Sequence, residues 1–496
     1  MSFKARPKAV RDAVRFRFRG ADVALRQFLP RATVLDWLRE DVGAKGTKEG
    51  CAEGDCGACT VVLARLKAGR LTHEPFNACI LLLGQLDGAE LITIEDLVSG
   101  GELHPLQQAM VEAHASQCGF CTPGIVMSLF AAYHSERPVT YAGLCDQLAG
   151  NLCRCTGYRP IIAAALESCD GDPTDRFAAT SRERAAALAA LADDSDVFVG
   201  DEAVFFAAPA SLDSLAALYA RFPDATLVSG ATDVGLWITK QLRDLKRVIW
   251  LGRVAGLDAV GESADSAVSL GATLSLEDAT PSLGAIHPDL TELLRRFGSK
   301  QVRASGTVGG NIANGSPIGD LAPALIALGG RVVLRKGERT RALPLEDFFI
   351  AYGKQDRGPG EFVLAVEAPR LAPHQRYCAF KVSKRFDEDI SAVMLAVRVD
   401  LDGRRVLGAR IACGGMAATP KRAENAERAL AGANLDQPAS WRAARAALSQ
   451  DFTPLTDMRA TAAYRSAVAA NILEKALVEV SGAGAPTRIG MLHAAE

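Results

Sequence analysis

Eight of the twelve cysteines in this chain of 496 residues stand in two groups whose spacing could bind iron. In the first group, the segment CAEGDCGAC sets Cys51, Cys56 and Cys59 in the C-x4-C-x2-C spacing of 2Fe-2S proteins, with Cys79 available as the distant fourth ligand. Such a cluster is anionic, so it needs backbone N–H donors and a loop free of bulky side chains. Four glycines supply that freedom: Gly46, Gly50, Gly54 and Gly57. The spacing predicts a 2Fe-2S cluster. A zinc site or a group of reactive thiols is less favoured, because zinc ligands usually come as two short pairs.

The second group consists of two cysteine pairs that lie about thirty residues apart. QCGFCTPG contains Cys118 and Cys121, and NLCRCTGYRP contains Cys153 and Cys155. Four thiolates from these pairs can converge at helix ends or turns, where free N–H groups suit an anionic cluster. Taken alone, two cysteine pairs could equally bind zinc.

Composition excludes several classes of function. Lys plus Arg (56) nearly balances Asp plus Glu (58), so we expect no binding of nucleic acid or of an anionic membrane. The most apolar stretches, such as Cys79–Leu83, are far shorter than the roughly 18 to 20 residues that cross a bilayer. The basic N-terminus has no apolar core or cleavage site, so we expect a soluble, cytoplasmic protein. The remaining cysteines are expected to be buried small hydrophobes: Cys145, Cys169, Cys378 and Cys413.

Secondary-structure patterns around both groups predict two small domains. Residues 12–96 contain alternating strands at Val14–Phe18 and Val23–Phe28 and a helix at Val34–Glu40 capped by Thr33, which is the order of a β-grasp ferredoxin domain. Residues 97–170 are expected to form an all-α bundle. Its helices are predicted at Leu106–His114, which follows Pro105, and at Gly124–Tyr133 and Ile161–Leu166.

Residues 171–198 are polar and Ala-rich and are predicted to be a linker, partly helical. An α/β pattern follows, with a helix at Ser211–Tyr219 and strands at Ala225–Ser229 and Val248–Leu251. No G-x-G-x-x-G fingerprint follows a strand, so a dinucleotide would bind in another way. LVSGATDVG reads as a strand entering a small-residue turn whose N–H groups and Thr232 hydroxyl could wrap a pyrophosphate. GTVGGNIANGSPIGD reads as a second glycine-rich loop.

The order of the cysteine motifs, C-x4-C-x2-C, then QCGFCTPG, then LCRCTGYRP, resembles the iron-sulfur part of the molybdenum hydroxylases, the family of xanthine dehydrogenase and aldehyde oxidase. The resemblance covers the first 170 residues closely. It implies that the helical cluster lies nearer the molybdenum centre and the ferredoxin-like cluster nearer the flavin. It also places Gln117 close to the pterin cofactor.

The segment Phe205–Ile390 resembles the FAD-binding domain of the same family, which is of the vanillyl-alcohol-oxidase type. The resemblance implies that FAD contacts come from two glycine-bearing segments and four further residues. These are Leu227, Val228, Ser229, Gly230, Ala231, Thr232, Asp233 and Val234; Thr307, Val308, Gly309, Gly310 and Asn311; and Phe297, Asp320, Val363 and Lys381. Arg296 stands where animal enzymes have a Trp. Lys384–Asp389 resembles a charged segment that covers the flavin, although a solvated surface loop is an equally simple interpretation.

We therefore expect a multidomain α+β chain with an FAD-binding α+β domain at 199–375 and a C-terminal α+β flavoprotein domain at 376–485. The last domain is predicted as a sheet backed by helices. Its strands are expected at Ser391–Val399 and Leu407–Cys413, and its helices at Ala423–Leu430 and Ala462–Val478.

The resemblance implies an electron-transfer subunit of a xanthine-oxidising enzyme of purine catabolism, which converts hypoxanthine and xanthine to urate. Electrons would pass from a molybdenum-pterin centre on a large partner subunit through two 2Fe-2S clusters to FAD and then to NAD. The assembly would be a dimer of heterodimers, and no residue of this chain would act as a catalyst in hydroxylation. Alternatives are a subunit that serves another N-heterocycle or an aldehyde, and a metal-binding scaffold or redox sensor without flavin.

Overall fold

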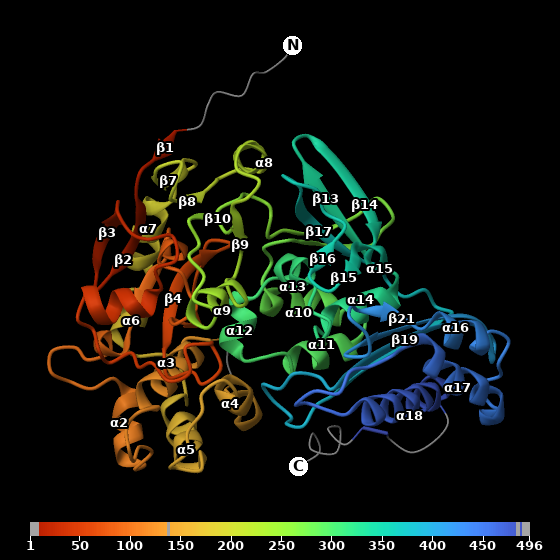
Figure 1. The fold of residues 1–496 in the computed structure, drawn as a ribbon. Helices are drawn as coiled ribbons and strands as arrows, with labels where there is room; N and C mark the ends of the chain where they lie inside the picture. Colours follow the sequence, from red (N-terminus) through yellow and green to blue (C-terminus); the bar gives the residue numbers. More distant parts are fainter. Residues whose placement is uncertain (1–8, 136–138, 483–486, 489–496) are drawn as a thin grey trace. The chain divides into compact units, whose positions relative to one another are not determined.

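The computed structural model describes residues 9–135, 139–482 and 487–488 and divides them into two compact units. The first unit comprises the chain up to Leu257 together with Gly298–Thr307. The second comprises Asp258–Phe297 and the chain from Val308 onward. Figure 1 labels the elements of both units along the chain. No helix among the described residues is both long enough and apolar enough to cross a membrane.

The first unit begins with a β-grasp sheet. The strand order is β3-β2-β6-β4-β5. Its strands are β2 (Val14–Phe18), β3 (Ala21–Leu25), β4 (Thr60–Lys67), β5 (Arg70–Asn77) and β6 (Glu90–Ile92). The predicted strand Val14–Phe18 is confirmed. Its partner starts at Ala21, earlier than predicted, because Arg19 and Gly20 both have positive φ and close a tight two-residue hairpin turn.

The helix predicted after Thr33 is confirmed, and it is short. In α1 (Val34–Asp36), Thr33 Oγ1 accepts a hydrogen bond from the Asp36 N–H at 3.1 Å, and the chain continues as a π-helical turn (Trp37–Asp41). The Trp37 ring packs edge-on against Phe16 and Phe18 of β2, at centroid distances of 5.5 and 5.3 Å. The helix therefore covers the buried face of the sheet next to the first cysteine group.

A helical bundle follows, as predicted. Its helices are α2 (Pro105–Glu112), α3 (Thr122–Tyr133), α4 (Tyr141–Leu148) and α5 (Arg159–Ser168). Almost all of α3 is buried, and its apolar side chains share one core with Val62 of β4 and Ile92 of β6. The sequence analysis did not predict α4, which buries only Leu144 and Leu148. Of the four cysteines outside the two groups, Cys169, Cys378 and Cys413 are buried, as predicted. The prediction is wrong for Cys145, which is exposed. It follows the buried Leu144 on α4 and therefore lies on the side of the helix that faces away from the core.

The segment predicted as a linker is partly helical, as expected, with α6 (Arg176–Ala179) and α7 (Ser181–Leu191). Asp175 caps α6 by accepting the Ala178 N–H at 2.8 Å, and it lies 2.8 and 2.9 Å from Nε2 of His104 and His134. Burial favours the neutral acid, but the hydrogen bonds with both histidines lower the pKa of Asp175 below its ordinary value. The linker is therefore tied to the bundle by a buried carboxylate.

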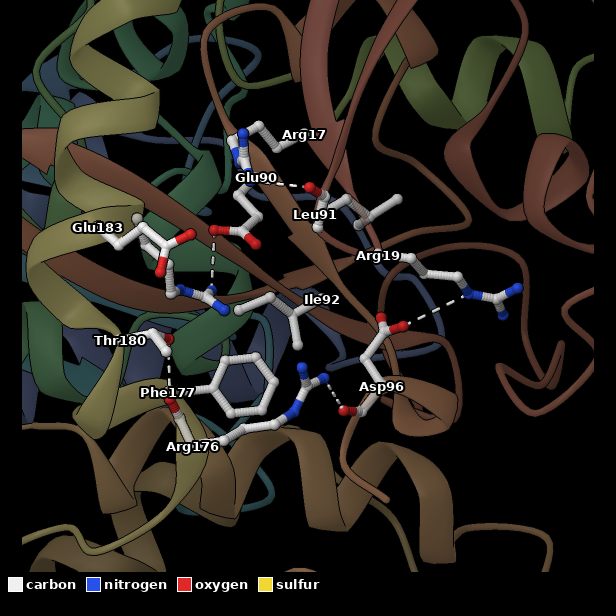
Figure 2. A pocket seen from close by; sticks show the side chains of 12 residues that line it. Arg17, Arg19, Glu90, Leu91, Ile92, Asp96, Arg176, Phe177, Thr180 and Glu183 are labelled. Atoms are coloured by element: carbon white, nitrogen blue, oxygen red, sulfur yellow. Dashed lines mark hydrogen bonds and ion pairs between the residues drawn. The ribbon is translucent and has the colours of Figure 1, made fainter. Parts of the chain in front are cut away.

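A small pocket between the β-grasp sheet and the linker helices contains a buried ion pair (Figure 2). Arg17, Arg19, Asp96 and Glu183 are among its lining residues. An Nη2 atom of Arg184 on α7 lies 2.9 Å from an Oε2 atom of Glu90 on β6, and both side chains are at least 90% buried. Burial raises the pKa of Glu90, and the nearby Arg184 charge opposes that shift.

The aromatic ring of Phe177 also lines this pocket, beside the ion pair of Arg184 and Glu90. The guanidinium groups of Arg176 and Arg184 lie 4.4 and 4.5 Å from its centroid. Four arginines and three carboxylates of the pocket thus face one another, so the pocket holds the linker against the sheet by internal charge pairing.

We expect Arg184→Met to destabilise the first unit by about 3 to 5 kcal/mol, because it leaves the buried Glu90 carboxylate without its partner. The double variant Arg184→Met/Glu90→Leu should recover most of that loss. Thermal unfolding followed by circular dichroism measures both effects. Arg182→Met, on an exposed position of the same helix, is the matched control. An Arg184→Met protein as stable as the Arg182→Met protein would contradict the anchoring role.

A second sheet completes the first unit, in the order β1-β7-β8-β10-β9. Its strands are β1 (Val10–Arg11), β7 (Asp196–Gly200), β8 (Phe205–Ala208), β9 (Thr226–Val228) and β10 (Arg247–Trp250). The helices α8 (Leu212–Arg221) and α9 (Val234–Thr239) belong to this part of the unit, whereas α12 (Lys300–Ser305) packs against β5 of the β-grasp sheet. The predicted helix and both predicted strands of this region are confirmed within one or two residues at their ends. One apolar core joins this sheet to the β-grasp sheet.

The second unit contains two antiparallel sheets, in the orders β11-β12-β17-β13-β14 and β18-β19-β20-β21, and a hairpin. The strands are β11 (Val260–Glu262), β12 (Val268–Gly271), β13 (Arg331–Lys336), β14 (Arg339–Pro344), β15 (Phe349–Ala351), β16 (Lys354–Gln355), β17 (Phe362–Ala368), β18 (Gln375–Val382), β19 (Val393–Asp402), β20 (Arg405–Gly414) and β21 (Lys421–Arg422). The helices are α10 (Leu276–Gly284), α11 (Pro288–Arg295), α13 (Val308–Asn314), α14 (Leu321–Leu328), α15 (Leu345–Phe348), α16 (Glu424–Leu430), α17 (Arg442–Asp451) and α18 (Ala462–Ser481). The predicted C-terminal sheet backed by helices is confirmed, with α16, α17 and α18 sharing a core with β18 to β20.

The prediction of a glycine-rich loop at Gly306–Asp320 is wrong for its first half, because Val308–Asn314 forms α13. The glycines serve close packing here. A Cβ atom on Gly309 would lie 2.5 Å from the Cβ of Ala272, and the Gly309 N–H donates to the Ala272 carbonyl at 2.9 Å. A helix can therefore press directly against the chain that follows β12.

Candidate iron-sulfur and flavin sites

The structure brings the four cysteines of the first group together. Cys51, Cys56 and Cys59 lie in the loop before β4, and Cys79 follows β5. The Sγ atoms of Cys59 and Cys79 are 3.3 Å apart, and Cys51 is within hydrogen-bonding reach of Cys56 and Cys79. These contacts lower the pKa of Cys51 and raise those of Cys56 and Cys79. The crowded thiols form a donor set for iron, which binds thiolates only after the protons leave.

The loop around this group supplies the N–H donors that an anionic centre requires. The backbone N–H groups of Glu53, Asp55 and Cys56 point to Cys51 Sγ at 3.4, 3.4 and 3.3 Å. Gly50 is needed for space, because a Cβ atom there would lie 2.7 Å from Cys56 Sγ. Gly54 has a φ of +77°, a conformation that favours glycine. The residues present therefore fit a 2Fe-2S cluster.

The second group also converges. Cys121 precedes α3, and Cys153 and Cys155 precede α5, so the sulfurs meet near two helix N-termini. Cys118 contacts Cys155, and Cys121 contacts Cys153. Burial raises the pKa of Cys121 to about 12. Unlike the first group, this one reaches the surface, with Cys118 and Cys155 exposed.

Tyr158 fixes the turn that carries Cys153. Its hydroxyl accepts the Cys153 N–H at 2.7 Å and donates to the Asn151 carbonyl at 3.1 Å. Tyr158 has a φ of +68°, which is rare for a residue with a side chain and indicates a turn held by its surroundings. Gln117, predicted near a pterin, is exposed and donates to the Cys155 carbonyl at 3.0 Å.

No group of three or more His, Cys, Asp or Glu residues in the described part of the chain is arranged around a single metal ion. A 2Fe-2S cluster makes a different demand, since four thiolates are shared between two irons.

The first predicted flavin segment lies in the first unit as a strand and a turn, as predicted, and a helix that was not predicted follows the turn. Leu227 and Val228 end β9, the residues from Ser229 to Asp233 form the turn, and Val234 begins α9. The Ser229 carbonyl accepts hydrogen bonds from Gln85 at 2.9 Å and Trp250 at 3.1 Å. Ala231 has a φ of +62°, and a Cβ atom on Gly230 would lie 1.7 Å from the Ser305 carbonyl oxygen. This tightly held small-residue turn fits a pyrophosphate.

Three of the four separate flavin candidates meet inside the second unit. Lys381 Nζ lies 2.8 Å from Asp320 Oδ2, with both side chains almost fully buried, and 5.9 Å from the Phe297 ring centroid. Ser391 Oγ donates to the other Asp320 oxygen at 2.5 Å. Val363 lies on β17, in a different sheet from Lys381. Thr307 ends the first unit's second segment, and Val308, Gly309, Gly310 and Asn311 lie in α13 of the second unit.

Arg296, which stands beside Phe297, is tied to the charged segment Lys384–Asp389. Its guanidinium donates to the carbonyls of Lys381 and Phe386, both at 3.2 Å, and lies 4.6 Å from the Phe386 ring centroid. A planar, always charged guanidinium can make these contacts together. The segment is therefore held within the second unit by Arg296.

The sequence analysis missed Lys240, which follows α9. Its Nζ donates to the Cys51 carbonyl and lies 3.7 Å from Glu53. The positive charge of Lys240, at the end of α9, thus lies next to the loop that carries Cys51. No spacing rule singles out this lysine among the 56 basic residues of the chain.

Comparisons with known proteins agree with this arrangement. Residues 93–166 match the [2Fe-2S] binding domain family, residues 202–371 match the FAD binding domain in molybdopterin dehydrogenase, and residues 378–480 match the CO dehydrogenase flavoprotein C-terminal domain. The chain belongs to the molybdenum hydroxylase family. Its multidomain α+β architecture and the binding of FAD and of a 2Fe-2S cluster are those of this family.

Curated relatives within the molybdenum hydroxylases include xanthine dehydrogenases. That of Emericella nidulans is 31% identical over 89% of this chain and 36% of its own length. Xanthine dehydrogenase 2 of Arabidopsis thaliana is 32% identical over 82% of this chain and 35% of its own length. The chain thus spans just over one third of the length of these relatives.

Among solved structures, a Cu,Mo-CO dehydrogenase in a cyanide-inactivated form matches with a TM-score of 0.53, 25% identity and coverage of 56% of this chain and 97% of that one. The carbon monoxide dehydrogenase of Hydrogenophaga pseudoflava matches with a TM-score of 0.52, 28% identity and coverage of 55% and 95%. Membership of this family indicates an oxidoreductase. The solved structures that the chain resembles belong to molybdenum-containing enzyme complexes.

We expect Lys381→Met to lower the FAD content of the purified protein and to destabilise the second unit by about 3 to 5 kcal/mol, because Asp320 remains buried without its cation. Flavin absorbance per chain and the midpoint of thermal unfolding measure these effects. Lys421→Met is the matched control, since the side chain of this exposed lysine in the same unit donates to the Asp451 carbonyl and has no carboxylate partner among the described residues. If the two variants had equal flavin content and equal stability, the Lys381–Asp320 ion pair would contribute neither to FAD binding nor to the stability of the second unit.

Proposed function

We propose that this chain is the electron-transfer subunit of a xanthine dehydrogenase. It would receive electrons from a molybdenum-pterin partner subunit and pass them through two 2Fe-2S clusters to FAD and then to NAD. Cys51, Cys56, Cys59 and Cys79 would bind one cluster, and a second would be bound by Cys118, Cys121, Cys153 and Cys155. The observation that carries the proposal is that each cysteine group gathers its four sulfurs, and that both groups lie in one compact unit.

The chain's own residues would hold and insulate these centres. When bound, the clusters carry single electrons and FAD exchanges pairs of electrons, including a hydride with NAD. The first group is more deeply placed, with Cys59 and Cys79 buried, whereas Cys118 and Cys155 of the second group face the surface. This asymmetry supports a direction of flow from a partner at the exposed group toward the flavin turn, to which Lys240 ties the first cysteine loop.

The substrate of the whole enzyme is part of the proposal. Xanthine dehydrogenases at 31% and 32% identity support the oxidation of hypoxanthine and xanthine to urate in purine catabolism. A subunit for another N-heterocycle or an aldehyde is the second candidate, because the likeness to carbon monoxide dehydrogenases indicates that similar chains also serve enzymes with other substrates. We further propose a dimer of heterodimers in the cytoplasm, with no residue of this chain acting as acid or base in hydroxylation. Co-purification with the partner and assay of NAD reduction with xanthine and with nicotinate separates the two candidates.

We expect Cys153→Ser to remove one 2Fe-2S signal from the electron paramagnetic resonance spectrum and to lower the iron content from about four to about two atoms per chain. Reduction of FAD by substrate should stop, because the route from the partner is broken. Cys145→Ser is the matched control, since Cys145 is an exposed cysteine outside both groups. Two unchanged signals in the Cys153→Ser protein would refute the ligand assignment.

We expect Phe120→Asp to weaken association with the molybdenum subunit by at least about tenfold, because a charge at the centre of an interface must lose its water. Phe120 lies between Cys118 and Cys121 and is 48% exposed, next to the sulfurs that the partner would approach. Leu407→Asp, at an exposed apolar position on β20, is the control. Affinity is measured by analytical ultracentrifugation, and unaltered assembly of the Phe120→Asp chain would place the partner elsewhere.

A further inference from the structure

One fully buried glutamine joins both cysteine loops. Gln301 lies on α12, in the segment Gly298–Thr307, and its side chain is inaccessible to solvent. Its Nε2 atom lies 3.2 Å from Thr60 Oγ1, 3.0 Å from Ser128 Oγ and 2.9 Å from Asn151 Oδ1. The three acceptors come from the β-grasp sheet, the helix α3 and the turn before Cys153. Gln301 itself lies within the stretch that matches the FAD-binding family.

The acceptors continue the network to the cysteine loops. Asn151 Nδ2 donates to the Gly57 carbonyl at 3.1 Å, and Thr60 Oγ1 donates to the same oxygen at 2.7 Å. Gly57 lies between Cys56 and Cys59, and Asn151 lies two residues before Cys153. Ser128 Oγ donates to Asn151 Oδ1 at 2.5 Å. The hydroxyl protons of Thr60 and Ser128 are therefore already donated to other atoms. Both hydroxyl oxygens and Asn151 Oδ1 can still accept, so a donor is needed at position 301, which the amide of Gln301 provides.

A direct backbone contact joins the two loops beside this network. The Leu152 N–H donates to the Cys56 carbonyl at 3.0 Å, so a ligand of the first group is one hydrogen bond away from the residue before Cys153. The Gln301 network involves Thr60, next to Cys59, and Asn151, next to Leu152. Its groups are buried, where a lost partner costs more than at the surface.

We infer that Gln301 is a positioning residue that fixes the separation of the two clusters. The inference rests on the proposed function, since it assumes that both cysteine groups hold 2Fe-2S clusters. Electron transfer between such centres falls steeply with distance, so a rigid link between the loops sets its rate. The residue acts through Asn151, Thr60 and Ser128 and touches no cysteine itself.

The test compares Gln301→Glu with Gln301→Met in the full chain with its clusters and FAD. Glutamate has the same shape but presents oxygens to Asn151 Oδ1 and Ser128 Oγ, and methionine removes the donor without adding charge. Gln147→Met is the control, because Gln147 on α4 donates to the Ser128 carbonyl and, among the described residues, has no hydrogen bond to a cysteine loop. The readouts are iron content, the magnetic splitting between the two reduced clusters in electron paramagnetic resonance, and the rate of flavin reduction.

Both cluster signals and the iron content should remain in the Gln301 variants, while the splitting becomes smaller or heterogeneous. Flavin reduction should slow severalfold relative to Gln147→Met, because electron transfer falls steeply as the distance between the clusters grows. Splitting and rates equal to those of Gln147→Met would overturn the inference. If Gln301→Glu fails to fold, Gln301→Met and Ser128→Ala, which remove donor or acceptor without burying charge, decide the matter by the same readouts. Absence of two signals in the unsubstituted protein would instead refute the proposed function.

Discussion

The absence of side chains at the contact between the two cysteine loops is the constraint on which the first unit depends. A Cβ atom on Gly57 would lie 2.0 Å from the Gly150 carbonyl oxygen, and one on Gly124 would lie 2.1 Å from the Gly57 carbonyl oxygen. Three glycines from three different segments therefore let backbone meet backbone. Because each glycine also precedes or follows a cysteine motif closely, this contact fixes where the sulfurs stand.

Such close backbone contact buries carbonyl groups away from water, and the side chains of the Gln301 network compensate for this. Carbonyl groups such as that of Gly57 are removed from water and need donors. Asn151 and Thr60 donate to the Gly57 carbonyl, and Gln301, from a different segment, donates to both of these side chains. The satisfaction of buried backbone groups and the fixing of loop geometry are thus achieved by the same side chains. The network leaves one buried atom unsatisfied, since Gln301 Oε1 has no hydrogen-bond partner among the described residues.

Much of this architecture was predictable from local sequence. Cysteine spacing predicted both thiol groups, and alternation or helical periodicity predicted strands such as β2 and helices such as α3, because these signals depend only on neighbours along the chain. The helix α13 was misread because glycines that permit close packing against Ala272 look the same in sequence as glycines that form a loop. Gln301 and Lys240 escaped prediction for a related reason. Their partners lie 150 to 241 residues away in sequence, and no periodicity encodes such a pairing.

The course of the chain around Gln301 gives the network a second consequence. The chain leaves the second unit after Phe297, contributes Gly298–Thr307 to the first unit, and returns at Val308. Of two predicted flavin contacts, Phe297 directly precedes the segment that carries Gln301, and Thr307 is the last residue of that segment. A helix as short as α12, held at Ser299 and Gln301 against Gly150, cannot shift at one end without moving the other. Thr307, a predicted flavin contact, and Gln301, which positions the cluster loops, thus lie on one short segment of the first unit, so a displacement of that segment would move both.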